Sequence, residues 1–287
     1  MSVLALVLVL LSAVAHATWN LLAKRTQGGA AFLWLFAALS SLIYAPIAAV
    51  VWLRSAQLQP QSGWLMAGSG VLHVLYFLLL QRGYRTGDLS VVYPLARGTG
   101  PLLSTAVAVL ALGERPTGLA LLGAVLVGLG AFLLTGGSSQ NPANSAQSQQ
   151  AIVYGLLTGA LIAAYTLWDK QAVSLFSVPP LLMDYGCNLW RVLLLTPLAL
   201  SRWPDVKQNW QTYRREVLGI ACLSPLSYIL VLTALSFTPV SYVAPTREIS
   251  ILLGVFFGTR LLAEGQMTRR LGAAVVMVLG VMMLILG

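Results

Sequence analysis

The chain has 287 residues, of which 58% are hydrophobic and only 9% are charged, and its mean hydropathy is +0.82. A soluble domain carries about 25% charged residues, so this composition excludes an ordinary soluble protein and indicates an integral membrane protein. The formal charge of +9 comes from Lys and Arg residues that lie mostly at the edges of apolar runs. No basic cluster is interleaved with aromatic residues, so we expect no nucleic-acid partner.

The N-terminal stretch contains an apolar core followed by Ala15-His16-Ala17, which is similar to a signal-peptidase site. No positive charge precedes the core, and the apolar run continues to Ala23. We therefore expect a first transmembrane helix over residues 3–23 and not a cleaved signal peptide.

Apolar segments of about 20 residues, enough to cross a bilayer, recur along the chain. Five of them precede a polar stretch, at 3–23, 31–53, 63–82, 88–112 and 117–135. That stretch, residues 136–150, reads GGSSQNPANSAQSQQ and is typical of a flexible linker. Five more segments follow it, at 151–169, 179–200, 215–236, 240–260 and 268–286. The sequence thus predicts an all-α membrane protein with ten transmembrane helices, in two halves formed by residues 1–135 and 151–287.

The two halves repeat each other. GDLSVVYP ends at Pro94 and TPVSYVAP ends at Pro245, an offset of 245 − 94 = 151. One residue drops out after the proline, and the offset of 150 then holds for three pairs: Arg97 with Arg247, Glu114 with Glu264, and Gly130 with Gly280. Since five spans are an odd number, the second half starts on the opposite side of the membrane, and the repeats are inverted. Inverted repeats with broken helices are typical of secondary transporters, whose substrate binds near the midplane.

The basic residues of the expected loops are unequally distributed. On the side where the chain begins, here called side A, the loops hold three: Arg54, Arg115 and Lys170. On the opposite side, side B, they hold eleven: Lys24, Arg25, Arg82, Arg85, Arg202, Lys207, Arg214, Arg215, Arg260, Arg269 and Arg270. The positive-inside rule makes side B cytoplasmic and places both termini outside.

Three segments resemble the EamA family of the drug/metabolite transporter superfamily: HATWNLLAKR, GDLSVVYPLARGTGPLLSTAVAVLALGERP and VSYVAPTREISILLGVFFGTRLLAEG. The resemblance covers essentially the whole chain and implies two EamA-like repeats of five helices each. It implies a transporter that exports or exchanges amino acids, other small metabolites or drugs, in a bacterial inner membrane, as a monomer or homodimer. Relatives with cytoplasmic termini leave the opposite orientation open.

The small four-helix multidrug relatives carry a membrane-embedded carboxylate in their first helix. The first helix here has His16, Thr18, Trp19 and Asn20 but no acid, and Asp169 comes only at the end of the expected sixth helix. This departure argues against an exporter of lipophilic cations, which we keep as the alternative.

The arginines inside the fourth and ninth segments are the strongest candidates for a binding site. An ionisable side chain within a bilayer costs about 3 kcal/mol or more, so it faces a cavity or a partner. Pro94 and Pro245 each lack an N–H and free a carbonyl one turn back, which membrane helices tolerate where the backbone is buried in protein or faces water. In one interpretation Arg97 and Arg247 bind an anionic substrate group, a carboxylate or a phosphonate, through forked hydrogen bonds. In the other they are structural, with Arg247 paired to Glu248 and Arg97 capping the freed carbonyls.

Other polar and aromatic residues are weaker candidates. Asp184, Asn188 and Arg191 are spaced i, i+4, i+7 and share one face of the seventh helix, with Asp184 near a surface end. His16 and His73 titrate near neutral pH and are candidates for proton coupling, as is Glu248, although a histidine bonded between helices is the plainer interpretation. For the walls of the site we favour four further residues: Trp19, Asn20, Tyr76 and Tyr228.

Two features are expected to be structural. Glu114 and Glu264 lie at corresponding helix ends near Arg115 and Arg260, where paired charges would anchor the interface. Small residues in GAVLVGLG, and more weakly Gly272 and Gly280, predict close helix packing, either within one half of the chain or between protomers.

The residues leave little room for other function classes. There is no HExxH motif and no Ser/His/Asp set with supporting context, so a membrane enzyme is the less favoured alternative. Cys187 and Cys222 form no metal-binding or disulfide pattern, and no cofactor is expected. The sequence therefore favours a secondary transporter of small polar metabolites, such as amino acids or related carboxylates, working by alternating access.

Overall fold

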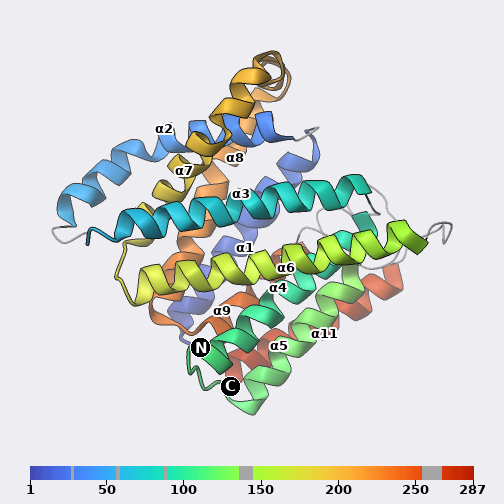
Figure 1. Cartoon of the computed structure of the whole chain (residues 1–287). Coiled ribbons are helices and arrows are strands. Elements are labelled where there is room, and N and C mark those ends of the chain that lie inside the picture. The colour runs from blue at the N-terminus through green and yellow to red at the C-terminus, as the bar shows by residue number, and fades with distance from the viewer. Residues whose placement is uncertain (27–28, 56–58, 87–88, 136–144, 254–266) are drawn as a thin grey trace.

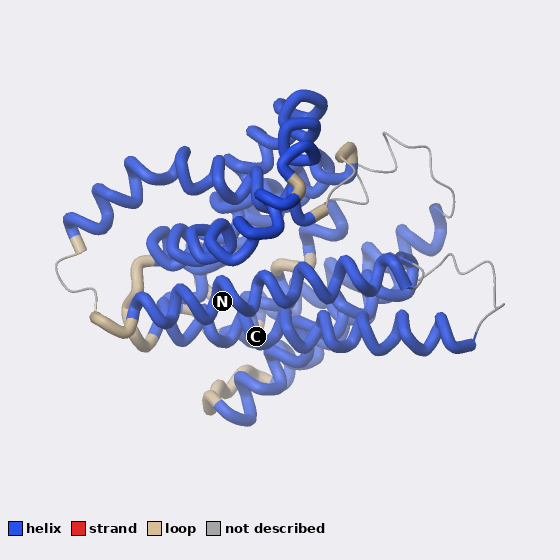
Figure 2. Tube along the Cα trace, turned by 45° about the horizontal axis from the view of Figure 1, so that its top comes forward, coloured by secondary structure: helices blue, strands red, loops and turns tan. Residues whose placement is uncertain are grey.

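The computed structural model describes residues 1–26, 29–55, 59–86, 89–135, 145–253 and 267–287. Within these ranges every regular element is a helix, joined by short loops (Figure 1, Figure 2). The all-α prediction is confirmed.

The first five helices lie close to the expected segments: α1 Val3–Lys24, α2 Ala30–Arg54, α3 Ser62–Thr86, α4 Leu89–Ala111 and α5 Gly118–Thr135. The second half gives α6 Ser145–Ser174, α7 Pro180–Ser201, α8 Trp203–Phe237, α9 Val240–Thr246 and α11 Met267–Leu286. Of the expected linker, residues 136–144 lie outside the described residues, and residues 145–150 belong to α6.

Three segments of the second half differ from the sequence expectation. Helix α6 continues five residues past the expected end at 169, to Ser174. Helix α8 begins twelve residues before the expected start at 215, and its backbone bends at Tyr213, where φ is −122° and ψ is 26°. The ninth segment, expected as one helix over 240–260, is α9 up to Thr246, a turn at residues 247–248 and helix again over 249–253.

Several helices are apolar enough to cross a membrane, as their composition predicted. In the described residues, five are both long and apolar enough: α1, α2, α3, α6 and α8. Shorter apolar stretches lie in α4, α5 and α11, at Leu95–Ala111, Gly118–Leu133 and Gly272–Leu286. The chain is thus a multi-pass membrane protein.

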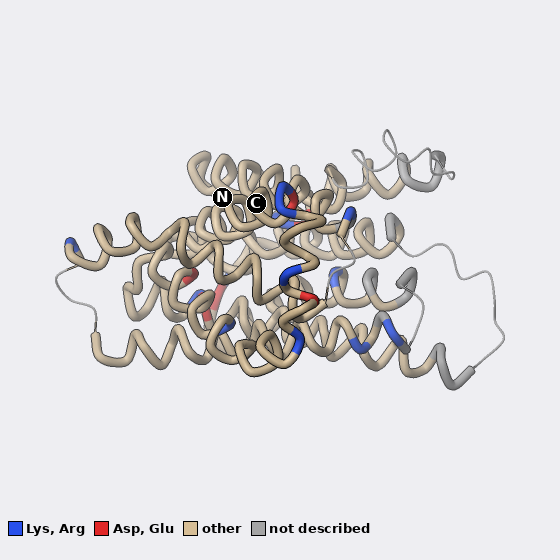
Figure 3. The backbone as a smooth tube through the Cα atoms, turned by 90° about the horizontal axis from the view of Figure 1, so that it is seen from above, with Lys and Arg blue, Asp and Glu red and all other residues tan. Residues whose placement is uncertain are grey.

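The main helix contacts join the two halves of the chain. Helix α5 packs along α11, α2 along α7, α4 along α6 and α9, α1 along α8, and α3 along α6 and α7. The N- and C-termini lie side by side at one end of the assembly (Figure 1, Figure 3). Neither half therefore buries its apolar surface by itself, and the core forms where the halves interdigitate.

Helices α5 and α11 approach each other closely at their glycines. A Cβ built on Gly280 would lie 2.7 Å from the carbonyl oxygen of Gly123, and one built on Gly123 would lie 2.5 Å from the carbonyl oxygen of Gly280. Gly130 lies against Met277 in the same seam. The small residues predicted for close packing thus bring the backbones of the two halves of one chain together, the role that glycine has between membrane helices.

Serine hydroxyls bond to backbone carbonyls of α8, one of which a proline leaves free. Pro225 inside α8 lacks an N–H, so the carbonyl of Ala221 has no partner within its own helix. Ser40 of α2 donates its hydroxyl to that carbonyl at 3.0 Å. Nearby, Ser12 of α1 donates to the carbonyl of Ser227 at 2.7 Å. These contacts satisfy polar backbone groups that have no water available inside a bilayer.

Two charged side chains hold the turn between α8 and α9. The carboxylate of Glu114, from the α4–α5 loop, accepts hydrogen bonds from the backbone N–H of Val240 at 2.7 Å and of Ser241 at 2.9 Å. The ammonium of Lys170 donates to the carbonyls of Leu235 at 2.6 Å and Thr238 at 3.0 Å. An acid at a helix N-terminus and a base at a helix C-terminus both oppose the helix dipole favourably. Glu114 is therefore structural, as expected, but it caps a helix and does not rely on Arg115; Glu264 and Arg260 lie outside the described residues.

Candidate functional site

The break after α9 places two charged residues inside the protein. Pro245, which is buried, cannot donate a hydrogen bond, and the helix ends one residue later at Thr246. The backbone then forms hydrogen bonds of the 3₁₀ type: Glu248 N–H donates to the Pro245 carbonyl at 3.0 Å, and Ser250 N–H donates to the Arg247 carbonyl at 3.0 Å. These bonds span three residues where an α-helix spans four. Arg247 and Glu248 form the turn, and their side chains leave it in different directions.

Glu248 points toward α4 and pairs with Arg97. The guanidinium Nε of Arg97 lies 3.2 Å from Oε2 of Glu248, and its Nη2 donates to the hydroxyl of Ser250 at 3.2 Å. Both charged side chains are buried, with relative exposures of 11% and 5%. The structural interpretation in which Glu248 pairs with its neighbour Arg247 is therefore wrong, because Glu248 pairs with Arg97 of α4.

Arg247 lies instead over an aromatic ring. Its Cζ is 5.5 Å from the ring centroid of Tyr228 on α8, within cation–π range. The Tyr228 hydroxyl donates a hydrogen bond to Oδ2 of Asp169 on α6. Among the described residues no carboxylate lies within ion-pair distance of Arg247. One tyrosine thus has a cation on its ring face and an anion at its hydroxyl.

Asp169 is the functional candidate that the sequence interpretation placed wrongly. It was expected at the end of a helix, but α6 continues to Ser174 and Asp169 is 0% exposed. Its Oδ1 accepts no hydrogen bond from the described residues. The adjacent Lys170 made the pair look like a polar helix end, whereas successive helix residues point about 100° apart. Lys170 therefore reaches the end of α8 while Asp169 points into the core.

Aromatic side chains surround these charges. Tyr165 of α6 stacks on His73 of α3, with ring centroids 4.1 Å apart, and meets Tyr228 edge-on at 6.4 Å. Tyr76, one turn from His73, meets Tyr165 edge-on at 5.7 Å. His73 Nδ1 lies 2.9 Å from the backbone carbonyl of Ser69. His73 is thus bonded within its own helix and packed between helices.

We call this group of seven residues the central cluster: His73, Arg97, Tyr165, Asp169, Tyr228, Arg247 and Glu248. It brings together five of the residues singled out from the sequence and adds Tyr165 and Asp169. Its members come from α3, α4, α6, α8 and the turn after α9. Figure 3 shows how sparse charged segments are in the chain, with acidic and basic ones next to each other inside the assembly.

The polar stripe of α7 is internal, as its spacing predicted. Asn188 donates to Oδ2 of Asp184 at 2.9 Å, and Arg191 donates to Oδ1 of Asn188 at 3.3 Å. Asp184 is 4% exposed and is therefore not a surface end residue. The Nε of Arg191 is buried and donates no hydrogen bond to the described residues. Cys187, on the same side of α7, lies 3.6 Å from Nδ1 of His73, which joins the stripe to the central cluster.

The candidates on α1 lie at different places relative to the cluster. His16 is within electrostatic range of Arg97 and Arg247. Trp19 meets the His16 ring edge-on at 4.9 Å, and its buried Nε1 has no hydrogen-bond partner among the described residues. Asn20 donates to the His16 carbonyl of its own helix at 2.8 Å. Pro94 lies within α4, which continues as a helix around it.

An apolar crevice of about 400 Å³ between α2, α3 and α7 is separate from these groups. Its walls include Trp52, Met66, Leu182, Tyr185 and Leu189, and Trp52 and Leu189 are exposed. Since the α7 stripe and the crevice lie on different faces of α7, the polar groups are not its lining. In the part of the chain that the structure describes, no three metal-ligating side chains come together.

Comparisons with known proteins give a family match for the first half of the chain and a fold match for the whole of it. Residues 3–136 match the profile of the EamA-like transporter family. A solved structure titled "Crystal structure of protein" matches 98% of this chain and 96% of its own, with a TM-score of 0.75 and 16% sequence identity. At that identity the match shows a shared fold. A search of curated protein sequences gives no significant match.

Proposed function

We propose that the chain is a transporter of the EamA-like family, which lies within the drug/metabolite transporter superfamily, and that it moves small polar metabolites that carry a carboxylate or a related anionic group. Amino acids and related carboxylates fit best. The substrate would bind at the central cluster, between the two halves of the chain, and be exported or exchanged by alternating access.

We further propose that the chain crosses the membrane ten times as two inverted repeats. Several helix contacts support this, because they persist when each helix is replaced by its counterpart: α1 with α8 becomes α6 with α3, and α2 with α8 becomes α7 with α3. The pairs α5–α11, α2–α7 and α4–α9 each map onto themselves. Adjacent termini support an even number of crossings.

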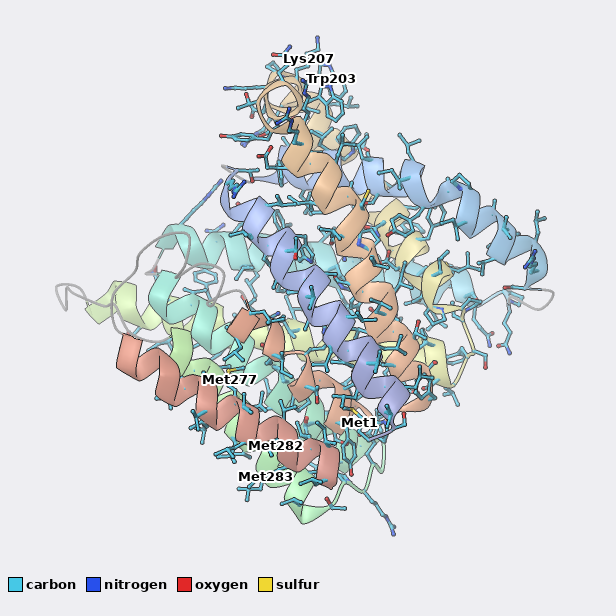
Figure 4. All side chains as sticks on the ribbon, turned by 180° about the vertical axis from the view of Figure 1, so that it is seen from behind. Met1, Trp203, Lys207, Met277, Met282 and Met283 are labelled. Atoms are coloured by element: carbon cyan, nitrogen blue, oxygen red, sulfur yellow. The ribbon has the colours of Figure 1, made fainter. Side chains whose placement is uncertain are left out.

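The orientation that we propose places side B in the cytoplasm of a bacterial inner membrane. Trp203 and Lys207, at the start of α8, lie at the end of the molecule opposite Met1 (Figure 4). Arg202, Arg214 and Arg215 are exposed in the same segment. Cationic residues beside tryptophans are typical of a cytoplasmic membrane interface, which supports termini outside.

One observation carries the substrate proposal, and it is the position of Arg247. Its guanidinium lies at a helix break, half-buried, on the face of Tyr228 and without a carboxylate in reach among the described residues. A buried guanidinium requires an anion, and its planar fork matches a carboxylate with two hydrogen bonds. Arg97 would hold Glu248 in place and add positive electrostatic potential to the site. The walls of the site would be completed by five further residues: Arg191, Asn188, Tyr76, Trp19 and Asn20.

The proposal is tested by transport in proteoliposomes and by thermal stabilisation of the purified protein. A ligand at 100 times its Kd adds about 2.7 kcal/mol to the stability, so amino acids and organic acids can be screened directly. Arg247→Ala should abolish stabilisation by carboxylates, and Arg247→Lys should weaken it because lysine cannot form the forked contact. Lys207→Ala, at the exposed start of α8, serves as the control. Unchanged stabilisation of Arg247→Ala would remove Arg247 from the site.

A second function, export of organic cations, is favoured by Asp169. The sequence placed no carboxylate within the first or sixth helix, but Asp169 is fully buried beside aromatic rings. Rings and a carboxylate together bind cations. Stabilisation by organic cations and by no carboxylate would make this the function.

A further inference from the structure

The central cluster contains a carboxylate oxygen that lacks a donor. Asp169 is 0% exposed, its Oδ2 accepts from the Tyr228 hydroxyl, and its Oδ1 accepts no hydrogen bond from the described residues. The Ser69 hydroxyl, on α3, is a polar neighbour of the Asp169 carboxylate and lies 3.3 Å from Nδ1 of His73, but it makes no hydrogen bond to Oδ1. Removing a donor from a buried acceptor costs about 1–3 kcal/mol, and more for a charged group. Such an oxygen requires a hydrogen-bond donor that does not come from the described residues.

The groups around Asp169 define what that partner can be. On its own helix, Tyr165 presents a ring to the same region, and Lys170 is committed to the end of α8. From the other helices the titratable or charged neighbours are His73 on α3, Asp184, Cys187 and Arg191 on α7, Tyr228 on α8, and Arg247 after α9. Within the described residues no Lys or Arg lies within ion-pair distance of the Asp169 carboxylate. The missing partner is therefore a cationic donor bounded by aromatic rings.

Tyr228 fixes the relation between this oxygen and the proposed carboxylate subsite. Arg247 Cζ lies 5.5 Å from the centroid of the Tyr228 ring, and the Tyr228 hydroxyl donates a hydrogen bond to Asp169. An anion-binding guanidinium and a cation-binding carboxylate are thus attached to one rigid side chain. A molecule that bears a carboxylate and an ammonium group a few bonds apart is complementary to both.

We propose that Asp169 is the ammonium-binding residue of the transport site and that it selects α-amino acids over carboxylates without an amino group. This inference rests on the proposed function for its carboxylate end and extends it at the other. Oδ1 of Asp169 accepts a hydrogen bond from the substrate ammonium, while the Tyr228 hydroxyl orients the Asp169 carboxylate by donating to its Oδ2. The rings of Tyr165 and Tyr228 contribute cation–π attraction.

The experiment uses the purified full chain and three matched probes for each of three side chains, small, branched and aromatic. The probes are the amino acid, its des-amino acid and its decarboxylated amine, and thermal shift gives their Kd values. The variants are Asp169→Asn, which keeps an acceptor for Tyr228, Asp169→Glu, which keeps the charge, and Asp205→Asn, an exposed acid at the start of α8, as the control. A charged hydrogen bond is worth about 1.5–3 kcal/mol, which corresponds to about 10- to 100-fold in Kd.

We expect wild type and Asp205→Asn to bind the amino acid about 10- to 100-fold more tightly than the des-amino acid. Asp169→Asn should lose this preference and stop binding the amine, while it keeps its affinity for the des-amino acid. Asp169→Glu should retain amine binding. An unchanged preference in Asp169→Asn overturns the inference.

The failures of the two proposals can be told apart. If wild type binds amino and des-amino acids equally, the proposed ammonium subsite is wrong, while the proposed transport of carboxylates is unaffected. This comparison uses wild type alone, so it can be made even if Asp169→Asn does not fold. If no probe with a carboxylate binds, the proposed function is wrong, and the amine probes still report on Asp169. Amine binding that survives in Asp169→Asn overturns the inference in that case too.

Discussion

Helices α4 and α9 carry the same unusual feature, a proline followed closely by an arginine in an apolar segment, and they fold differently. In α4 the helix runs without interruption from Leu89 to Ala111. In α9 it stops at Thr246, and Arg247 and Glu248 form a turn. As a result Arg97 reaches across to an ion pair, whereas Arg247 lies at a break with its guanidinium over Tyr228.

The single residue that α9 lacks relative to α4 accounts for much of this difference. Arg97 follows its proline by three residues and Arg247 by two. One residue of an α-helix corresponds to a rotation of about 100°, so the two arginines would face different directions even if both helices were continuous. Sequence repetition therefore does not imply equal surroundings: Arg97 forms an ion pair with Glu248, and Arg247 lies over the Tyr228 ring.

The largest expected effect comes from breaking the Arg97–Glu248 pair. Arg97→Ala and Glu248→Ala should each lower the free energy of unfolding by about 3–5 kcal/mol, because each leaves a buried charge uncompensated. The double variant Arg97→Met/Glu248→Leu should lose less than either single change. Denaturant titration in detergent measures all three, and additive losses would contradict the pairing. Arg247→Ala should cost about 0.5–2 kcal/mol, the value of a cation–π contact.

A smaller effect is expected at the α8–α9 turn. Glu114→Gln should destabilise the protein by about 1.5–3 kcal/mol, because a charged acceptor for two backbone N–H groups of α9 becomes neutral. Arg115→Ala, the exposed neighbour, should stay within about 0.5 kcal/mol of wild type. Equal effects of the two changes, in the same titration, would mean that the cap contributes nothing.

Next comes the seam where α5 and α11 meet. Gly280→Ala should cost about 1–3 kcal/mol, since the new methyl group would meet the Gly123 backbone. Gly272→Ala on the same helix has open space around its Cβ position and should be neutral or stabilising by up to about 1 kcal/mol. Thermal unfolding distinguishes the two, and equal midpoints would place the close approach elsewhere.

The smallest effect on stability is expected from the prolines. Pro245→Ala should change the unfolding free energy by about 1 kcal/mol or less, since the helix already ends there. It should nevertheless slow amide exchange at residues 247–248, because an added N–H lets α9 extend through the turn. Pro94→Ala is the matched control, and because α4 is already continuous, exchange there should not change. Equal responses of both segments would remove the distinction between α4 and α9.

Much of the molecule could be predicted from the sequence. The apolar runs predicted the positions of α1 to α5 and of α7 within a few residues, because a bilayer requires about 20 apolar residues for each crossing. The spacing of Asp184, Asn188 and Arg191 predicted an internal face of α7. The glycines predicted close packing, although the pattern left open which helices would meet.

What the sequence could not give was the direction of individual charges. Asp169 looked like a helix end because Lys170 follows it, and Glu248 looked like the partner of Arg247 because the two are adjacent. Adjacency along a helix separates side chains, and partners come from other helices: Tyr228 is 59 residues from Asp169, and Arg97 is 248 − 97 = 151 residues from Glu248. The ion pair of Glu248 with Arg97, from the other half, depends on the rotation of each helix about its axis.

The sequence by itself thus determined the all-helical membrane architecture and the position of most helices, and it predicted the repeat and the transporter class, since these follow from hydrophobic length, periodicity and motif. The tertiary structure decided which of the described charges are paired with each other, as Arg97 is with Glu248, and which have no ion-pair partner among the described residues, for example Arg247 and Asp169. That division depends on how helices from the two halves pack around one tyrosine, because a buried charge is stabilised only by groups within a few ångströms of it.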